Sequence, residues 1–393
     1  MKEGVPLVAY FYPQDHTDPS RLAAAKKSGQ KDIPSEMELL RQAKPLFEGH
    51  MHPKYTIGNN ITDWQDTDEN AIARQAELAQ EYGLDAWMLL AYAGMLNSQK
   101  HVELERAIKI IAQRKDSLQF SLISCLGLPR TILPVPHNIE QSRSRERDFD
   151  FSLQTFLAII DNAAQYWDNP RYLRLNGKPL LTIYGLRPAK VEQLAKLYPY
   201  LPEELERYAE KKYGEKVHIT ANAFDIPGAQ ALSNLGFKHI TTYSHLPTFD
   251  QIQHDPDAKK DGLAVNLDIQ YYLEQLERRK KEWYQLLADE KVSTFTPNVT
   301  VGWDGSSRGE SGLNQNQISG QFPWFPIIAD STPENFRVGL NEVWDYLQHI
   351  PAENRIMLIL AWNEIGNGSA LLPRAKLNGE VDHSYLETLK EFI

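Results

Sequence analysis

Cysteine is almost absent from this chain of 393 residues. The single thiol, Cys125, excludes an internal disulfide and any cluster of thiolate metal ligands. It lies in an apolar run without a basic neighbour in sequence, which predicts a buried, unreactive side chain. Long apolar runs are also missing, because the longest, residues 84–96, is shorter than the roughly 18 to 20 residues of a membrane-spanning helix. We therefore expect no membrane span.

An excess of positive charge is missing as well. The chain has 42 Lys and Arg against 52 Asp and Glu, a formal net charge of −10, which argues against nucleic acid or an anionic membrane surface as its main partner. No secretory signal follows Met1. The expected location is the cytoplasm, or the periplasm or exterior if a leader has been removed.

Two motifs that would indicate other enzyme classes are absent. No Gly-rich phosphate-binding turn follows a strand-like segment, so a nucleotide site of the Rossmann type has no support. No Gly-x-Ser-x-Gly elbow is present, which removes the best sequence signal for a serine hydrolase. Without repeats or linkers, residues 1–393 are expected to form one domain, and no cofactor is predicted.

What the chain does contain is a regular alternation of short apolar runs and amphipathic stretches. The helical stretches include residues 69–82, 102–114, 152–167, 267–287 and 333–348. The eight predicted strands are residues 5–12, 86–92, 119–126, 179–184, 217–223, 239–243, 294–302 and 356–362.

Eight strand-helix units in one chain predict an α/β fold, a closed (β/α)8 barrel of the TIM type. An open doubly wound sheet is the alternative. Such a barrel needs about 250 residues, and the surplus falls in four segments that each follow the C-terminal end of a strand. We expect these long βα loops to lie on the C-terminal face of the barrel, which carries the active sites of barrel enzymes. They are residues 14–67, 126–149, 246–265 and 305–332.

The eighth predicted strand ends in Trp362, Asn363 and Glu364, directly before a Gly-rich turn. A carboxylate beside an indole and an amide is suited to sugar rings, which offer apolar faces and directional hydrogen bonds. Glu364 is therefore the first candidate catalytic residue. A role in capping or ion pairing at the rim is the alternative.

The seventh strand ends similarly, in Trp303 and Asp304, with Arg308 four residues further on. Asp304 is the second catalytic candidate, and Arg308 could pair with it or hold a substrate oxygen. An Asp turn stabilised by its own backbone contacts remains possible.

Histidines give a weak signal for a metal. His50 and His52 form an H-x-H pair, but at the C-terminal ends of the later strands His245 is the only histidine that could join them. We therefore predict no metal and expect these histidines to donate hydrogen bonds to substrate hydroxyls or loop backbone. Further residues expected to contact substrate at the strand ends are Tyr12, Tyr92, Tyr184, Asn222, Asp225 and Tyr243.

Several segments together resemble the glycoside hydrolase family 99-like proteins, which include endo-α-mannosidases and the related WbsX-type proteins of polysaccharide loci. The resemblance covers most of the chain. It is carried by residues 9–13 (AYFYP), 44–53 (KPLFEGHMHP), 66–68 with 82–87 (DTD, YGLDAW), 172–179 (YLRLNGKP), 302–308 (GWDGSSR) and 361–364 (AWNE).

The resemblance implies a barrel with a sugar cleft on its rim and a final motif W-N-E-x-x-E-G with two carboxylates. In such enzymes the first Glu takes the proton of the sugar 2-hydroxyl, and the second protonates the leaving oxygen. Glu364 matches the first position. The second position is Asn367, and an amide cannot serve as a general acid.

Three functions remain open. The first is a glycosidase for an α-linked oligo- or polysaccharide, with its second acid supplied from elsewhere by Asp304, Asp225, Glu310 or Asp15. The second is a protein that binds a glycan without cutting it, through the same tryptophans and tyrosines. Asn367 is also expected to contact substrate. The third is a transferase or assembly protein of a polysaccharide locus.

Overall fold

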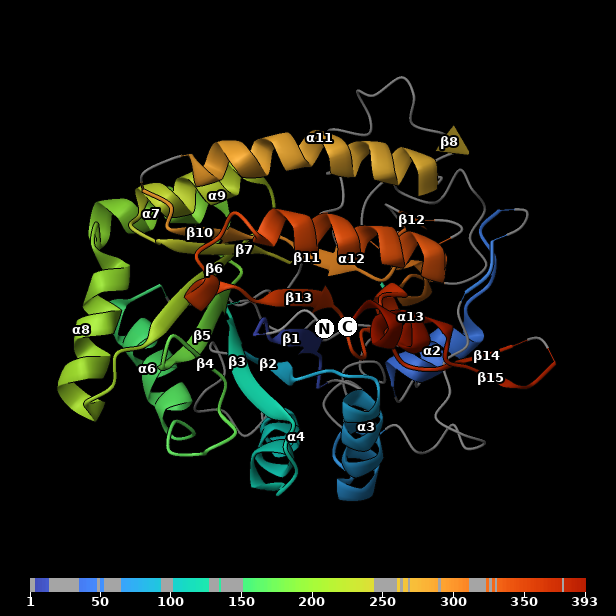
Figure 1. Ribbon diagram of the computed structural model, residues 1–393, viewed down its shortest axis with the longest axis horizontal. Coiled ribbons are helices and arrows are strands. Elements are labelled where there is room, and N and C mark those ends of the chain that lie inside the picture. Colours follow the sequence, from blue (N-terminus) through green and yellow to red (C-terminus); the bar gives the residue numbers. More distant parts are fainter. Residues whose placement is uncertain are drawn as a thin grey trace.

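The computed structural model (Figure 1) describes most of the chain. The described residues are 4–13, 35–47, 50–52, 65–92, 102–126, 134–135, 151–243, 260–261, 264–267, 269–288, 291–310, 323–324, 327–328, 331–376 and 378–393.

The main sheet is a nearly closed barrel of parallel strands, as predicted. Its strand order is β10-β7-β6-β5-β3-β2-β1-β13-β11, and β10 and β11 are consecutive in sequence, which brings the two ends of the order together. The strands are β1 (Leu7–Phe11), β2 (Ala86–Tyr92), β3 (Gln119–Cys125), β5 (Lys178–Tyr184), β6 (His218–Ala223), β7 (His239–Thr242), β10 (Thr294–Thr296), β11 (Asn298–Thr300) and β13 (Met357–Leu360).

The seventh predicted strand is divided at Pro297. Thr296, before this residue, pairs with β7, whereas Asn298, after it, pairs with β13. Proline has no backbone N–H and cannot donate to a ladder. Because of this break, residues 294–300 pair with β7 through β10 and with β13 through β11. The barrel keeps the eight units expected from the sequence.

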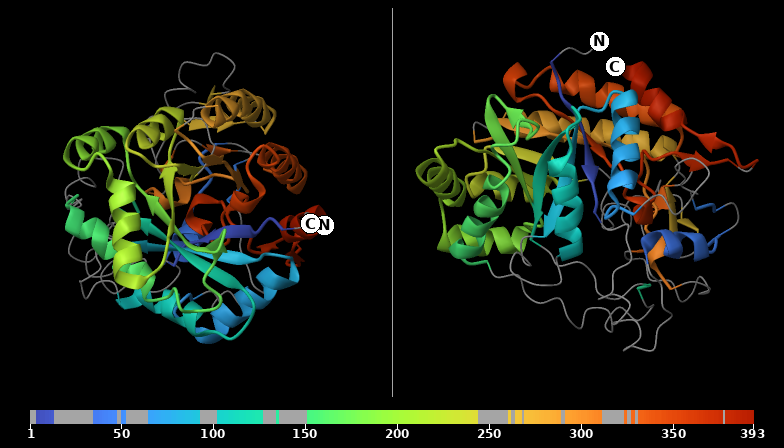
Figure 2. Two further views of the ribbon diagram at one scale, coloured as in Figure 1. Left: turned by 60° about the vertical axis from the view of Figure 1, so that its left-hand side comes forward. Right: turned by 90° about the horizontal axis from the view of Figure 1, so that it is seen from below.

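The helices form an outer ring around the strands (Figure 2). They follow the strands in turn, and the five predicted helical stretches are confirmed. The helices are α2 (Glu36–Gln42), α3 (Glu69–Glu81), α4 (Val102–Gln113), α6 (Leu153–Ala164), α7 (Pro188–Leu197), α8 (Leu201–Tyr213), α9 (Ile226–Asn234), α11 (Ile269–Leu287), α12 (Pro333–Leu347) and α13 (Ser384–Phe392). The two chain ends lie side by side (Figures 1 and 2).

Small elements complete the described part of the fold. The short strands are β4 (Arg174–Leu175), β8 (Lys260–Asp261), β9 (Ala264–Leu267), β12 (Ile327–Ile328), β14 (Arg374–Ala375) and β15 (Val381–Asp382). Single turns of 3-10 helix are η4 (Ser306–Arg308), η6 (Ala352–Asn354) and η7 (Ile365–Asn367). Among the residues that the structure describes, no helix has the length and apolar character needed to cross a bilayer.

Two apolar clusters support the barrel, because alternate residues of each strand point inward and outward. The outer cluster packs the sheet against the helices and contains Trp87 and Phe120. The inner cluster fills the barrel and contains Tyr10, Met88 and Cys125, so the predicted burial of the thiol is confirmed.

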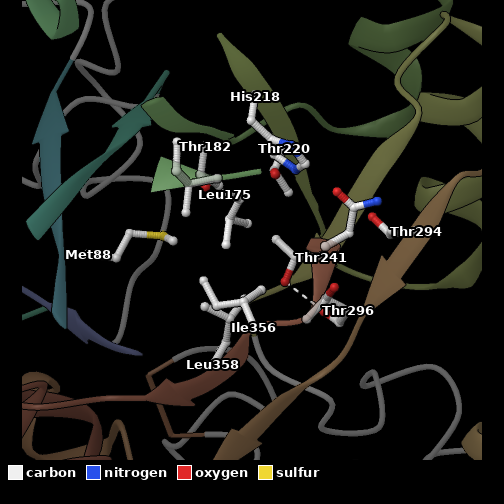
Figure 3. A pocket seen from close by; sticks show the side chains of 12 residues that line it. Met88, Leu175, Thr182, His218, Thr220, Thr241, Thr294, Thr296, Ile356 and Leu358 are labelled. Carbon is white, nitrogen blue, oxygen red and sulfur yellow. Dashed lines mark hydrogen bonds between the residues drawn. The ribbon is translucent and has the colours of Figure 1, made fainter. Parts of the chain in front are cut away.

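The N-terminal half of the barrel interior holds a small pocket lined by both polar and apolar side chains, at the opposite end of the strands from Glu364. Figure 3 shows threonines from several strands around it, together with His218 at the start of β6. Thr241 donates a hydrogen bond to the carbonyl of Thr296 at 2.7 Å, whereas the buried hydroxyl of Thr182 has no partner among the described residues.

His218 stacks on His239 of the neighbouring strand, with ring centroids 4.0 Å apart. Burial, followed by His239 and Lys178, lowers the pKa of His218 to about 3. Burial, followed by Lys178 and Lys238, lowers the pKa of His239 to about 4. Both rings are therefore neutral at pH 7, and His239 is further fixed by Thr294 at 2.9 Å from its Nδ1.

This pair should make the fold sensitive to acid. Below the unfolded pKa of about 6.5, the two histidines bind protons in the unfolded chain but stay neutral in the folded protein. Stability is therefore lost as the pH falls toward the pKa values of the folded state. His218→Gln should therefore lose less stability than the wild type between pH 7 and pH 4.5, by about 1 to 2 kcal/mol. Urea unfolding at both pH values tests this, with the exposed His349→Gln as control. Equal losses in wild type and His218→Gln would contradict the prediction.

Candidate active site

Three short elements meet beyond the C-terminal ends of β11 and β13. They are α2, η4 and η7, which come from the segments that follow β1, β11 and β13. Figure 1 shows α2 on the side toward which the arrows of β11 and β13 point. The barrel thus brings together parts of the chain that are far apart in sequence, at the face where such folds carry their sites.

Glu364 is the carboxylate at the centre of this group. Its side chain is buried, with 3% of the residue exposed. The hydroxyl of Tyr243 donates to Oε2, and the amide of Asn367 donates to Oε1. Burial raises the pKa of Glu364, against the lowering effects of Arg308 and the two hydrogen bonds. The raised pKa brings the carboxyl closer to neutral pH, where a proton can be both released and taken up.

Arg308 is a second buried charge beside it. Its Nη1 lies 3.8 Å from Oε1 of Glu364. Its closest charge partner is Glu36, whose Oε2 accepts from Nε at 3.0 Å and from Nη2 at 2.7 Å. Burial acts against the charged guanidinium, but Glu36, Tyr12 and Glu364 outweigh burial and raise the pKa of Arg308.

Asn367 connects these charges. Its Oδ1 accepts from Nη1 of Arg308, and its Nδ2 donates to Glu364. Because a guanidinium only donates and a carboxylate only accepts, these two partners define the orientation of the amide. Asn367 therefore occupies the place of the second motif carboxylate as a bridge between Arg308 and Glu364.

Asp304 belongs to a neighbouring group with the two predicted histidines. Its Oδ2 lies 2.8 Å from Nε2 of His50 and 3.0 Å from Nδ1 of His52. Its Oδ1 accepts from the backbone N–H and the hydroxyl of Ser306. Burial acts to raise the pKa of Asp304, but the two histidines outweigh it and lower the pKa far below its usual range. Asp304 is therefore ionised at neutral pH and does not carry the proton of a general acid.

His50, His52 and Asp304 offer atoms that could hold a metal ion, all within 4.8 Å of one another. The hydrogen bonding of His50 argues against that use. Its Nδ1 accepts from the backbone N–H of Leu46 at 3.0 Å, which leaves the ring proton on Nε2, facing Asp304. With its Nε2 proton facing Asp304, His50 has no lone pair on that nitrogen for a metal, so the group fits a hydrogen bond from His50 to Asp304 better.

Aromatic side chains surround Glu364. Tyr12, Tyr184, Tyr243 and Trp303 are partly buried and pack against the inner cluster. The hydroxyls of Tyr12 and Tyr92 lie 3.1 Å apart. Tyr184 and Tyr243 have ring centroids 4.8 Å apart. Partly exposed rings with hydroxyls in one place are suited to the apolar faces and hydroxyls of a sugar.

Two residues expected at the sugar surface have structural positions instead. Trp362 is fully buried, packs against Trp87 and donates to the side chain of Gln75 at 2.8 Å. Asn363 bonds both backbone groups of Tyr12, at 2.7 and 2.9 Å. The expectation of substrate contact is therefore corrected for both, because an indole and an amide at a strand end satisfy buried neighbours before they can meet a ligand.

Two other residues predicted to contact substrate form hydrogen bonds within the protein. Asp225 caps α9 by accepting from the backbone N–H of Gly228 at 2.7 Å. Asn222 is fully buried and donates to the hydroxyl of Tyr10 at 3.3 Å. His245 and Asp15 lie outside the described residues.

Glu36 was not among the predicted site residues. Its position in the first turn of α2 is typical of a helix that begins after a Ser cap, here Ser35. No local pattern distinguishes it from such a residue. Only its burial, with 4% exposed, and its contact with Arg308 show its place in the site.

The arrangement can be compared with known proteins. The family described as "Glycosyltransferase WbsX" matches residues 145–389, more than half of the chain. The chain belongs to the WbsX family. That stretch includes Asp304, Arg308, Glu364 and Asn367.

Two curated relatives extend the similarity beyond the family match. Both are described as "Uncharacterized protein WxcX", from two strains of Xanthomonas campestris pv. campestris, and are 27% identical to this WbsX-family chain over 391 and 390 residues. The alignments cover 94% of this chain and 48% of each relative. The chain therefore spans about half the length of these relatives.

Solved structures share the fold at low sequence identity. A glycoside hydrolase family 99 endo-α-mannosidase from Bacteroides thetaiotaomicron, in complex with Bis-Tris-propane, aligns over 98% of this chain and 95% of its own, with a TM-score of 0.56 and 12% identity. A "Glycoside hydrolase-like protein" aligns over 99% and 94%, with a TM-score of 0.60 and 13% identity. These similarities support the (β/α)8 barrel.

Proposed function

We propose that this WbsX-family protein cleaves an α-linked oligo- or polysaccharide, with Glu364 as a proton-transferring carboxylate. The observation that carries the proposal is the buried carboxyl of Glu364 at the end of β13, with its pKa raised and with donors on both oxygens. A group of this kind at the rim of a barrel is typical of a catalytic acid or base. The similarity to glycoside hydrolases supports a sugar as substrate.

Hydrolysis requires a second proton-transferring group, because the leaving oxygen takes a proton as the glycosidic C–O bond breaks and water supplies the new hydroxyl. Asn367 and the ionised Asp304 do not fit that role. His52 fits it better: its Nδ1 lies 3.0 Å from Oδ2 of Asp304 but forms no hydrogen bond among the described residues. His50 differs because both of its ring nitrogens are engaged.

This assignment predicts a dependence on the leaving group. His52→Gln should slow cleavage of an unactivated glycan about 100-fold, the usual effect of losing general acid catalysis. It should slow an aryl glycoside with an acidic phenol far less, since that leaving group needs no proton. Rates on both substrates test this, with His50→Gln as the matched control. An equal loss on both substrates would contradict the role of His52.

A transferase is the second candidate, because the matching family carries the description of a glycosyltransferase. The two reactions differ in the acceptor that receives the sugar. Incubation with a panel of α-mannans, α-glucans and rhamnose- or fucose-containing polysaccharides, with and without oligosaccharide acceptors, followed by mass spectrometry, separates them. Shorter oligosaccharides without an acceptor support hydrolysis. Longer products only when an acceptor is present support transfer, and retention of a glycan without any product supports a binding protein.

A further inference from the structure

Glu36 and Arg308 form an ion pair that the proposed reaction does not use directly. Both residues are buried, with 4% and 6% exposed. The Nε and Nη2 edge of the guanidinium faces Glu36, while Nη1 faces Asn367 and, at 3.8 Å, Glu364. The guanidinium of Arg308 is thus shared by two carboxylates. The nearer one belongs to Glu36, and the other is Glu364 of the final motif.

The segments around the Glu36–Arg308 ion pair pack closely against it. A side chain at Gly366 would overlap the carboxylate of Glu36, and its Cβ would lie 2.6 Å from Nε of Arg308. The apolar residues Met37, Leu39 and Leu40 anchor α2 to the protein. Since η7 contains Gly366 and directly follows Glu364, the segment that carries the motif carboxylate is also packed against the ion pair.

We propose that Glu36 is a positioning residue for Glu364, because by holding Arg308 it sets how much of the guanidinium charge acts on the Glu364 carboxyl. This inference rests on the proposed function of Glu364. A guanidinium engaged twice by Glu36 is largely neutralised, so Glu364 experiences an ion pair rather than a free cation. Without Glu36, the full charge of Arg308 would act on Glu364, and the mutual repulsion of the two carboxylates would disappear.

The direction of the effect follows from the groups that face Glu364. They are the cation Arg308, the anion Glu36 and the neutral hydroxyls of Tyr12, Tyr184 and Tyr243. After burial, which raises the pKa of Glu364 most, Arg308 lowers it and Glu36 raises it. Replacing Glu36 by a neutral residue should therefore lower the pKa of Glu364.

The experiment is a carbon-13 NMR titration of the Glu364 carboxyl in the full chain, assigned with Glu364→Gln. Glu36→Gln should move the titration to lower pH by about one unit or more. Glu36→Asp, which keeps the charge on a shorter side chain, should give a smaller shift. Glu391→Gln removes the exposed partner of Arg337 and should change nothing.

The outcomes separate this inference from the proposed function. An unchanged Glu364 titration in a folded Glu36→Gln variant would overturn the inference, and if that variant does not fold, the absence of any shift in Glu36→Asp would do so. The titration needs no substrate, so a protein that cleaves no glycan but shows the shift contradicts the proposed function only. If cleavage is observed, the pH-rate limb assigned to Glu364 should move with the NMR titration, which a purely structural ion pair would not cause.

Discussion

Glu364→Gln should reduce glycan cleavage by about 100- to 10,000-fold, the range associated with the loss of a positioned acid or base. The substitution keeps the shape of the side chain but removes its ability to exchange a proton. Tyr243 and Asn367 should remain close, because a glutamine oxygen still accepts from one of them and a tyrosine hydroxyl can accept from the new amide. Binding of the glycan should therefore change much less than the rate.

The measurement is the initial rate of product release, together with the affinity for the uncleaved glycan by calorimetry. Glu353→Gln is a matched control, since Glu353 is exposed in η6, before β13, at the opposite end of the barrel. A Glu364→Gln variant as active as the control would exclude Glu364 from the chemistry. Loss of both rate and affinity would instead indicate that Glu364 mainly binds the sugar.

Arg308→Met should be the most destabilising single substitution in the site, by about 3 to 5 kcal/mol in the free energy of unfolding. It leaves Glu36 and Glu364 buried without their shared cation. It also removes the donor to the Oδ1 of Asn367. An unpaired carboxylate in a buried place costs far more than the net value of the pair.

The loss should depend on pH. A buried carboxylate without its counter-ion takes up a proton more readily in the folded state than in the unfolded chain. Such a raised folded pKa contributes stability at low pH that is lost as the pH rises, so Arg308→Met should be less stable at pH 8 than at pH 5.5, relative to wild type. Urea unfolding at both values measures this. Arg337→Met, which breaks the exposed Arg337–Glu391 pair, should change stability within about 1 kcal/mol.

Much of the barrel could be predicted from local patterns. A strand such as Ala86–Tyr92 is a continuous apolar run, because it is covered on both faces, and the amphipathic stretch of α3 follows a Ser/Asp-type cap at Asp68. Such signals are contained within a few residues. The division at Pro297 was also readable in principle, since proline cannot donate to a ladder.

The candidate site was only partly predictable. Glu364, Arg308 and Asp304 were identified because a polar residue directly after an apolar strand lies at the rim of a barrel. The same reasoning placed Trp362 and Asn363 at the sugar surface. The sequence pattern does not indicate that the indole N–H of Trp362 is bonded to Gln75, or that the amide of Asn363 is bonded to the backbone of Tyr12.

By itself, then, the sequence determined the eight strand-helix units, the end of the barrel that carries the site, and the replacement of the second motif carboxylate by Asn367. The tertiary structure alone decided which charges meet. Glu36 and Arg308 are 272 positions apart, and no local pattern relates them. Their pairing depends on the packing of α2 against η4 and η7, and electrostatic energy depends on distance and burial, which exist only in the folded chain.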